Sequence, residues 1–251
     1  MSKMEKKLYC YKCLFFLVVV ILFISMAVAN AHENSIKINS MLNPVVQVKV
    51  DGGRGSGTIF KVRGKFSYIV TNFHVVARAL WLSESPDKQG YTFVRKDISI
   101  NIFIHKSGKV EMQTFPAYIY AWNAEEDLAT LRIEHRAKYV ATMYTSKYLR
   151  EFDSIVIVGA PLGSIPVPGQ GIVSNLFDEY MGKWRIGVTA DIVWGHSGGA
   201  AFIEHKGKYL YVGMLSNLAS IPADEFTIPL PFLGSMIPSS VVLEFLHAHG
   251  L

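Results

Sequence analysis

One histidine, one aspartate and one serine of this chain stand in segments that suit them to cleave an amide bond together. Ser197 lies in the glycine-rich sequence Trp-Gly-His-Ser-Gly-Gly-Ala. His74 follows an apolar β-type run, and Asp127 directly precedes another such run. In serine hydrolysis an imidazole takes the proton of the serine hydroxyl, while a carboxylate orients that imidazole. These three residues are therefore the candidate catalytic triad.

Glycines on both sides of Ser197 favour a tight turn that projects the serine hydroxyl. Such a turn can point the backbone N–H groups of Gly195 and Ser197 at one spot, which is the geometry of an oxyanion hole. The same glycine pattern also suits a flexible turn without a catalytic role. The serine segment alone leaves both interpretations open.

The aspartate of the candidate triad comes from a run of three acids, Glu125, Glu126 and Asp127. Three adjacent acids are usually a solvated loop. Asp127 is preferred because it abuts the apolar strand, where a carboxylate could be buried against an imidazole. A single histidine at a strand end, such as His74, is likewise more often structural than catalytic.

Short apolar runs predict that the chain from residue 44 onward consists mainly of β-strands. Val46, Val48 and Val50 alternate with polar residues, as in a half-buried strand. Gly, Pro, Asn or Asp separates most runs, at close to the roughly 8 to 12 residues typical of sandwiches and barrels. Pro238 and Gly250 bracket one predicted C-terminal helix. The other predicted strands are 58–62, 67–71, 98–105, 114–121, 128–133, 154–158, 171–176, 184–188, 200–204, 209–215 and 226–230.

The N-terminus has the pattern of a secretory signal peptide. Four lysines precede an apolar run over residues 14–29, and Ala29 and Ala31 provide a small-x-small cleavage site before His32. The run is shorter than the roughly 20 residues that cross a bilayer comfortably. We expect residues 1–31 to be removed from an exported, periplasmic or secreted protein. An uncleaved membrane anchor is the alternative.

The composition outside residues 1–31 argues against several other functions. Those residues hold four Lys and one Glu, so the rest of the chain has a formal net charge of only +2. No basic arm then remains to bind nucleic acid. Both cysteines, Cys10 and Cys13, would leave with the signal peptide, so no disulfide is expected. His247 and His249 lie two apart on the predicted helix, face different directions and make a poor metal pair.

Six motifs in order make the chain resemble the trypsin-like (chymotrypsin-fold) serine peptidases. The resemblance is strongest to the bacterial high-temperature-requirement protease branch, without the peptide-binding domain of that branch, for which no room is left before Leu251. It covers residues 44–246. The motifs are Gly55–Gly57, Thr71–Val76, Asp127–Leu131, Gly159–Gly163, Gly171–Ser174 and Gly195–Gly199.

The resemblance implies an all-β fold of two six-stranded antiparallel barrels, with the active site between them. The first barrel would cover residues 40–145, and the second, with the C-terminal helix, residues 146–251. His74 and Asp127 would come from the first barrel and Ser197 from the second. No metal or organic cofactor enters the mechanism. The edge strand that binds the substrate would contain Leu215, Ser216 and Asn217.

Two further positions matter for specificity and activity. Asp191 lies six residues before the nucleophile, where an aspartate at the base of the primary pocket selects Lys or Arg in trypsin-like enzymes; the high-temperature-requirement branch instead prefers small apolar residues. His196 stands where family members usually have Asn or Asp. Its imidazole either weakens the oxyanion hole in a pH-sensitive way or faces outward without a role.

The sequence thus predicts a serine endopeptidase that hydrolyses polypeptide substrates through an acyl-enzyme. The alternative is a catalytically silent trypsin-like domain that binds peptides or protein partners in the same cleft. We expect a monomer, with membrane contact only if the N-terminal segment stays uncleaved. The complete set of three residue types favours the enzyme, and His196 favours the silent domain.

Overall fold

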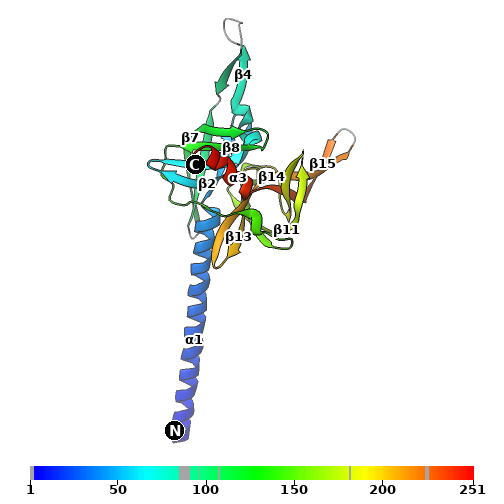
Figure 1. Cartoon of the computed structure of the whole chain (residues 1–251). Helices are drawn as coiled ribbons and strands as arrows, with labels where there is room; N and C mark the ends of the chain where they lie inside the picture. The colour runs from blue at the N-terminus through cyan, green and yellow to red at the C-terminus, as the bar shows by residue number, and fades with distance from the viewer. Residues whose placement is uncertain (1–2, 85–90, 96, 107, 181, 224–225) are drawn as a thin grey trace. The chain divides into compact units, whose positions relative to one another are not determined.

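The computed structural model describes residues 3–84, 91–95, 97–106, 108–180, 182–223 and 226–251 of the chain (Figure 1). The chain forms two compact units. One comprises Met1–Ile38 and the other Asn39–Leu251. The second unit contains every strand and all the candidate functional residues.

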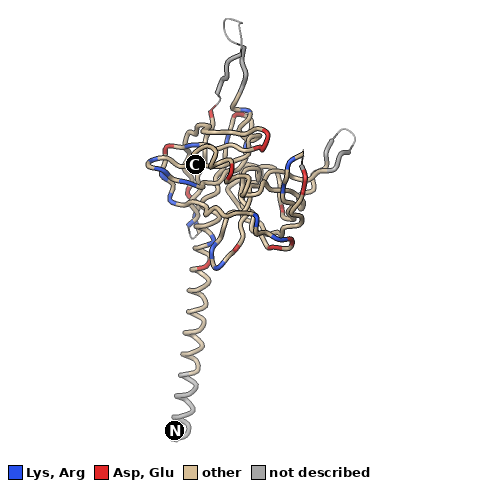
Figure 2. The backbone as a smooth tube through the Cα atoms, viewed as in Figure 1, with Lys and Arg blue, Asp and Glu red and all other residues tan. Residues whose placement is uncertain are grey.

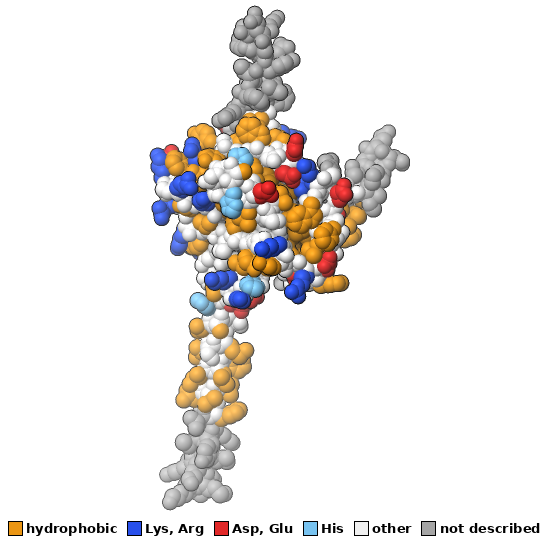
Figure 3. All heavy atoms as spheres, viewed as in Figure 1, with side chains coloured by type: hydrophobic (Ala, Val, Ile, Leu, Met, Phe, Trp, Pro, Cys, Tyr) orange, Lys and Arg blue, Asp and Glu red, His pale blue; other side chains and the backbone are white. Residues whose placement is uncertain are grey.

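The first unit is a single helix, α1 (Lys3–Lys37). The stretch Phe15–Leu42 contains an 18-residue window with a mean hydropathy of 2.3 and is long and apolar enough to cross a membrane, a test that a signal sequence also passes. Figure 3 shows apolar side chains around the described part of the helix. Figure 2 shows charges of both signs on the other unit and none along most of the described part of α1.

Six antiparallel strands close the first barrel in the order β1-β2-β3-β8-β7-β6. Apolar side chains at alternating positions, among them Val46, Val48 and Ile100, fill its interior. Gln47, whose alternation predicted a solvent-facing side chain, is buried because the amide of Asn101 donates to its Oε1 at 2.7 Å. The strands are β1 (Val45–Val50), β2 (Gly53–Arg63), β3 (Phe66–Asn72), β6 (Ile98–Lys106), β7 (Lys109–Asn123) and β8 (Leu128–Ile133).

The second barrel follows the order β13-β10-β11-β12-β15-β14, and the pairing of β13 with β14 closes it. A two-residue strand, β9 (Thr142–Met143), pairs with β14 in parallel, so the second sheet already begins before the expected boundary at residues 145/146. The strands are β10 (Ser154–Gly159), β11 (Val167–Tyr180), β12 (Lys183–Ala190), β13 (Ala200–His205), β14 (Lys208–Ala223) and β15 (Phe226–Pro238).

Helix α3 (Ser239–Ala248) packs on β14 and β15, as predicted, and buries Val242, Phe245 and Leu246. The expected fold, two six-stranded antiparallel barrels with a C-terminal helix, is confirmed.

Several local elements were not predicted. The hairpin of β4 (Leu80–Glu84) and β5 (Tyr91–Arg95) lacked a recognisable pattern, and β14 and β15 extend well beyond their predicted bounds. The short helices are α2 (Phe73–Val76), a π-helix at Ile38–Leu42, and 3-10 turns at Ala77–Ala79, Ser146–Tyr148 and Pro161–Gly163.

Candidate active site

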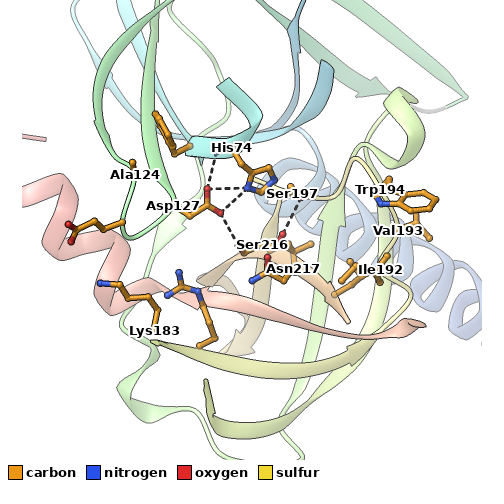
Figure 4. Close-up of a pocket in the computed structure, with 15 residues that line it drawn as sticks. His74, Ala124, Asp127, Lys183, Ile192, Val193, Trp194, Ser197, Ser216 and Asn217 are labelled. Atoms are coloured by element: carbon orange, nitrogen blue, oxygen red, sulfur yellow. Dashed lines mark hydrogen bonds and ion pairs between the residues drawn. The ribbon is translucent and has the colours of Figure 1, made fainter. Parts of the chain in front are cut away.

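The candidate triad residues all line one cavity of about 500 Å³ between the two barrels (Figure 4). His74 and Asp127 reach it from the first barrel, and Ser197 reaches it from the second. The other lining residues are Phe73, Ala124, Glu125, Lys183, Arg185, Ile192, Val193, Trp194, Leu215, Ser216, Asn217 and Leu218.

His74 lies in α2, the short helix that begins where β3 ends at Asn72. Val75 and Val76 on the same helix are buried in the core of the first barrel. This burial fixes the helix to the barrel rim. His74 can therefore project into the cavity with half of its side chain, 50%, exposed.

Asp127 lies at the end of the turn that joins β7 to β8. The side chain of Asn123 accepts hydrogen bonds from the backbone N–H groups of Glu125 (3.0 Å) and Glu126 (3.1 Å), an Asx-type turn. Asp127 itself has a φ of 59°, a left-handed conformation that aspartate tolerates better than most residues. Its carbonyl oxygen accepts from the N–H of Phe73 at 3.1 Å, which ties the turn to α2.

The Asp127 carboxylate accepts hydrogen bonds on both oxygens. His74 approaches it twice, with its backbone N–H 2.9 Å from Oδ1 and its ring Nδ1 2.9 Å from Oδ2. Asn72 Nδ2 donates to Oδ2 at 2.9 Å, and Ser216 Oγ donates to it at 3.1 Å. With Nδ1–H pointed at a carboxylate, the other ring nitrogen, Nε2, is left to accept a proton.

Ser197 lies in a loop that only glycine can build at several positions. A Cβ on Gly198 would stand 2.1 Å from the carbonyl oxygen of Ser56, and one on Gly199 would stand 2.4 Å from that of Val158. The Ser197 hydroxyl donates to the carbonyl oxygen of Ser216 at 3.2 Å. Figure 4 shows Ser197 close to the His74 ring at the centre of the cavity.

The backbone N–H groups of Gly195 and Ser197 are the predicted oxyanion donors. Within the described part of the chain, neither Gly195 N nor Ser197 N donates a backbone hydrogen bond. The carbonyl oxygen of Trp194 accepts from Leu162 N at 2.7 Å. Because N–H and C=O point in opposite directions across a trans peptide, this bond turns Gly195 N–H away from the Leu162 loop.

The predicted substrate-binding strand does border the cavity, through Leu215, Ser216 and Asn217. The pairing of β14 with β15 shifts register between Leu215 and Asn217, so Ser216 is the extra residue of a β-bulge. Ser216 lies on the cavity wall, where the sequence placed it. Its hydroxyl also donates to Asp127, a contact that a strand pattern in the sequence does not reveal.

Asp191 does not occupy the base of this cavity. Its side chain is exposed and is absent from the cavity lining, whereas the next residue, Ile192, is buried and lines it. The Ile192 side chain packs against Gly234, where an added Cβ would stand 2.9 Å from Ile192 Cδ1. In the described structure Asp191 is thus not placed to pair with a Lys or Arg side chain in this cavity.

His196 does not face outward, contrary to the simpler expectation. Its side chain is 4% exposed, and its Nδ1 lies 3.2 Å from Val193 N and 3.0 Å from Val193 O. A Cβ on Gly159 would stand 2.8 Å from the His196 ring. Burial lowers the pKa of His196 below its ordinary value of 6.5, and the hydrogen bond to the Val193 backbone opposes this shift.

The lowered pKa of His196 predicts a loss of stability in acid. The unfolded chain binds this proton more readily than the folded chain, so the contribution of His196 is complete above pH 6.5 and declines as the pH falls below it. We expect His196→Asn to reduce the loss of unfolding free energy between pH 7.5 and 5.0, measured by urea unfolding. The exposed His247→Asn should behave as the wild type does, and an unchanged pH dependence in His196→Asn would refute the prediction.

Lys183 and Arg185 also line the cavity, and they form a cluster of charges with Glu126 that was not anticipated. Arg185, only 3% exposed, donates from Nη2 to the carbonyl oxygen of Glu126 at 3.3 Å and lies 3.6 Å from its carboxylate. Lys183 pairs with the same carboxylate at 3.0 Å. Within the described residues, no group of three or more His, Cys, Asp or Glu could hold a metal ion.

A family model for the trypsin-like peptidase domain matches residues 55–214. The chain belongs to this family. Two curated relatives, both named serine protease Do-like HtrA, come from Lactococcus lactis subsp. lactis (strain IL1403) and subsp. cremoris (strain MG1363). Each is 28% identical, over 206 and 205 residues respectively, or 77% of this chain and 44% of the relative. The chain thus lies near the HtrA branch and spans less than half the length of these relatives.

Solved structures share the fold. Deg5 matches with a TM-score of 0.61 and 24% identity, over 86% of this chain and 92% of that one. The HtrA-type protease AlgW, solved with a tripeptide, matches with a TM-score of 0.61 and 20% identity, over 85% of this chain and 62% of that one. At these identities the likeness concerns the fold alone.

Proposed function

We propose that the protein is a serine endopeptidase that cleaves polypeptides through an acyl-enzyme, with His74, Asp127 and Ser197 as its triad. The observation that carries this proposal is the pairing of the Asp127 carboxylate with His74 Nδ1 at 2.9 Å, in a cavity that Ser197 also lines. Membership of the trypsin-like peptidase family supports the reaction class.

In the proposed reaction, Ser197 Oγ attacks the scissile carbonyl carbon while its proton passes to His74 Nε2. The negative charge that develops on the substrate oxygen is stabilised by Gly195 N–H and Ser197 N–H. The C–N bond then breaks, and His74 returns the proton to the leaving amine. Water, activated by the same imidazole, hydrolyses the serine ester and restores the free hydroxyl. Asp127 stabilises the transient imidazolium throughout.

The Ser197 hydroxyl has to leave its bond to Ser216 O before it attacks. Catalytic hydrogen bonds are often long or misaligned before substrate binds and tighten in the complex. A rotation about χ1 of Ser197 would exchange Ser216 O for His74 Nε2 as the acceptor. The silent-domain alternative rests on this bond to Ser216 O and on His196 in place of the usual Asn or Asp.

The substrate is proposed to bind as an additional strand beside Leu215–Asn217, with backbone hydrogen bonds that do not depend on sequence. The side chain before the scissile bond would enter the apolar pocket of Ile192 and Leu218. An apolar pocket leaves a buried ammonium or guanidinium unpaired, at a cost of several kcal/mol by the general cost of unpaired charge. We therefore propose cleavage after apolar residues.

A proteolysis experiment tests both the activity and this preference. We expect the wild type to cut an unfolded protein such as β-casein after Val, Ala or Leu, with cleavage sites read by mass spectrometry. Asp191→Ser should leave the pattern unchanged, because Asp191 lies outside the cavity lining. Absence of cleavage would reject the enzyme, and cleavage after Lys or Arg that disappears in Asp191→Ser would reject the apolar pocket.

The helix α1 supports a proposal that the protein is exported. It suits either a signal peptide removed after Ala31 or an anchor that keeps the barrels at a membrane. A polypeptide substrate outside the cytoplasm follows from either case. The monomeric state remains a prediction.

A further inference from the structure

We propose that Ser56 is a positioning residue that holds the oxyanion loop, defined as residues 193–198, in its productive shape. The inference rests on the proposed peptidase function. Ser56 lies in β2 of the first barrel, whereas the loop belongs to the second, and its side chain is completely buried. In the sequence, Ser56 belongs to the motif Gly55–Gly57, which supported the family resemblance without giving Ser56 a role in the reaction.

Three polar groups of Ser56 make four hydrogen bonds, and two of these bonds reach the loop. Its Oγ donates to the carbonyl oxygen of Gly195 at 2.6 Å, and its backbone N–H donates to the carbonyl oxygen of Ser197 at 2.8 Å. The same Oγ accepts from Ala160 N at 2.8 Å. The carbonyl oxygen of Ser56 accepts from Thr71 Oγ1 at 2.7 Å, which fixes β2 behind it.

All four carbonyl groups from residue 194 to residue 197 have a donor. Trp194 O accepts from Leu162 N (2.7 Å) and His196 O from Gly199 N (2.8 Å), while Ser56 supplies the donors for the other two. Each carbonyl bond fixes one peptide plane. Ser56 therefore holds the planes that carry His196 N–H and Gly198 N–H. The first of these two planes lies between the planes that carry Gly195 N–H and Ser197 N–H, so it limits how both of those can turn.

Of the four N–H groups from residue 195 to residue 198, two donate to a backbone carbonyl and two do not, among the described residues. His196 N donates to Val193 O at 3.1 Å, and Gly198 N donates to Leu215 O at 2.9 Å. Among the described residues, Gly195 N and Ser197 N have no backbone acceptor. The donors left over are the two that the proposed mechanism needs for the oxyanion.

A loop with glycines at positions 195, 198 and 199 needs such restraints, because glycine samples backbone conformations that other residues avoid. Without the Ser56 hydroxyl, the Gly195–His196 peptide would keep only the 3.1 Å bond from its N–H to Val193 O and would be held on one side alone. Ala160, whose N–H donates to Ser56 Oγ, belongs to the segment 160–164. This segment is also held in place, since Gln47 Nε2 donates to Gly163 O and, at 3.1 Å, to Ser164 O.

The simpler explanation is that the Ser56 hydroxyl only satisfies buried backbone groups and supports stability. The chain offers a matched control for this explanation. Ser67, also completely buried, donates from Oγ to His135 O and accepts from Ala137 N at 2.9 Å. Ser67 thus has the same burial and the same bonding pattern, but none of its partners belongs to the oxyanion loop.

The test compares Ser56→Ala with Ser67→Ala and the wild type in peptide hydrolysis per titrated active site. We expect Ser56→Ala to lower kcat by about 10- to 100-fold with little change in KM, because misplaced oxyanion donors weaken binding of the transition state alone. The inhibition constant of a peptide boronate, which forms a tetrahedral adduct, should rise by a similar factor. Ser67→Ala should keep the wild-type kcat and lose only thermal stability.

Four outcomes bear against the inference or against its foundation. A folded Ser56→Ala with wild-type kcat, or an equal loss of kcat in Ser67→Ala, would overturn the role of Ser56. An inactive wild type would overturn the proposed function instead. If Ser56→Ala does not fold, Ser56→Cys replaces it, because a thiol fills the site but is a much weaker donor than a hydroxyl. An unchanged kcat in folded Ser56→Cys would then overturn the inference.

Discussion

Ser197→Ala is expected to lower peptide hydrolysis by about 10⁴- to 10⁶-fold and to leave the fold intact, as for nucleophile loss in a serine protease. Alanine removes only the hydroxyl, whose one hydrogen bond in the structure is a 3.2 Å contact to Ser216 O. The glycines that shape the loop are untouched. Initial rates on a peptide substrate and thermal unfolding together measure the two halves of this prediction.

The double variant His74→Ala/Ser197→Ala provides the control for Ser197→Ala. Triad members act as a unit, so the second substitution should add little to the first. Retained turnover in Ser197→Ala would reject the proposed nucleophile. A further large loss in the double variant would indicate that the two residues act independently, which the mechanism does not allow.

Asp127→Asn is expected to lower kcat by about 10⁴-fold, as replacement of the triad aspartate does in serine proteases. The Asp127 carboxylate accepts from His74 N, His74 Nδ1, Asn72 Nδ2 and Ser216 Oγ. An amide offers one oxygen and one NH₂ in the same space. If the NH₂ faces Nδ1, the ring proton moves to Nε2, and His74 can no longer accept the proton of Ser197.

Glu125→Gln is the matched control for Asp127→Asn. Glu125 also lines the cavity and lies two residues away, but its side chain is exposed and makes no contact with His74 among the described interactions. We expect its activity to stay within about 2-fold of the wild type, the size typical of an exposed charge. Equal losses in the two variants would mean that general negative charge, rather than the Asp127–His74 hydrogen bond, supports activity.

The barrels and the segments that carry the candidate triad could be predicted because they depend on local signals. Alternating apolar residues, as in β1, specify strands, and glycines specify the turn around Ser197. The preference for Asp127 over its acidic neighbours followed from its position at the start of an apolar strand. In the structure this residue pairs with His74, and Glu126 instead pairs with Lys183.

The contacts that hold the site depend on tertiary structure and left no pattern in the sequence. Ser56 meets Gly195 across 139 positions of the chain, and Ser216 meets Asp127 across 89. His196 is buried because the loop folds back on Gly159, which no local propensity encodes. Asp191 lies outside the cavity lining. Counting positions from the nucleophile cannot tell which way a loop side chain points.

Labelling with a serine-directed fluorophosphonate tests the proposed nucleophile most directly. The reaction needs both a serine hydroxyl that a neighbouring general base activates and an oxyanion hole. We predict one phosphonyl adduct per folded wild-type molecule, located on Ser197 by mass spectrometry, and none in His74→Ala. A folded wild type that takes up no label, or takes it up on another residue such as Ser216, would contradict the proposed nucleophile.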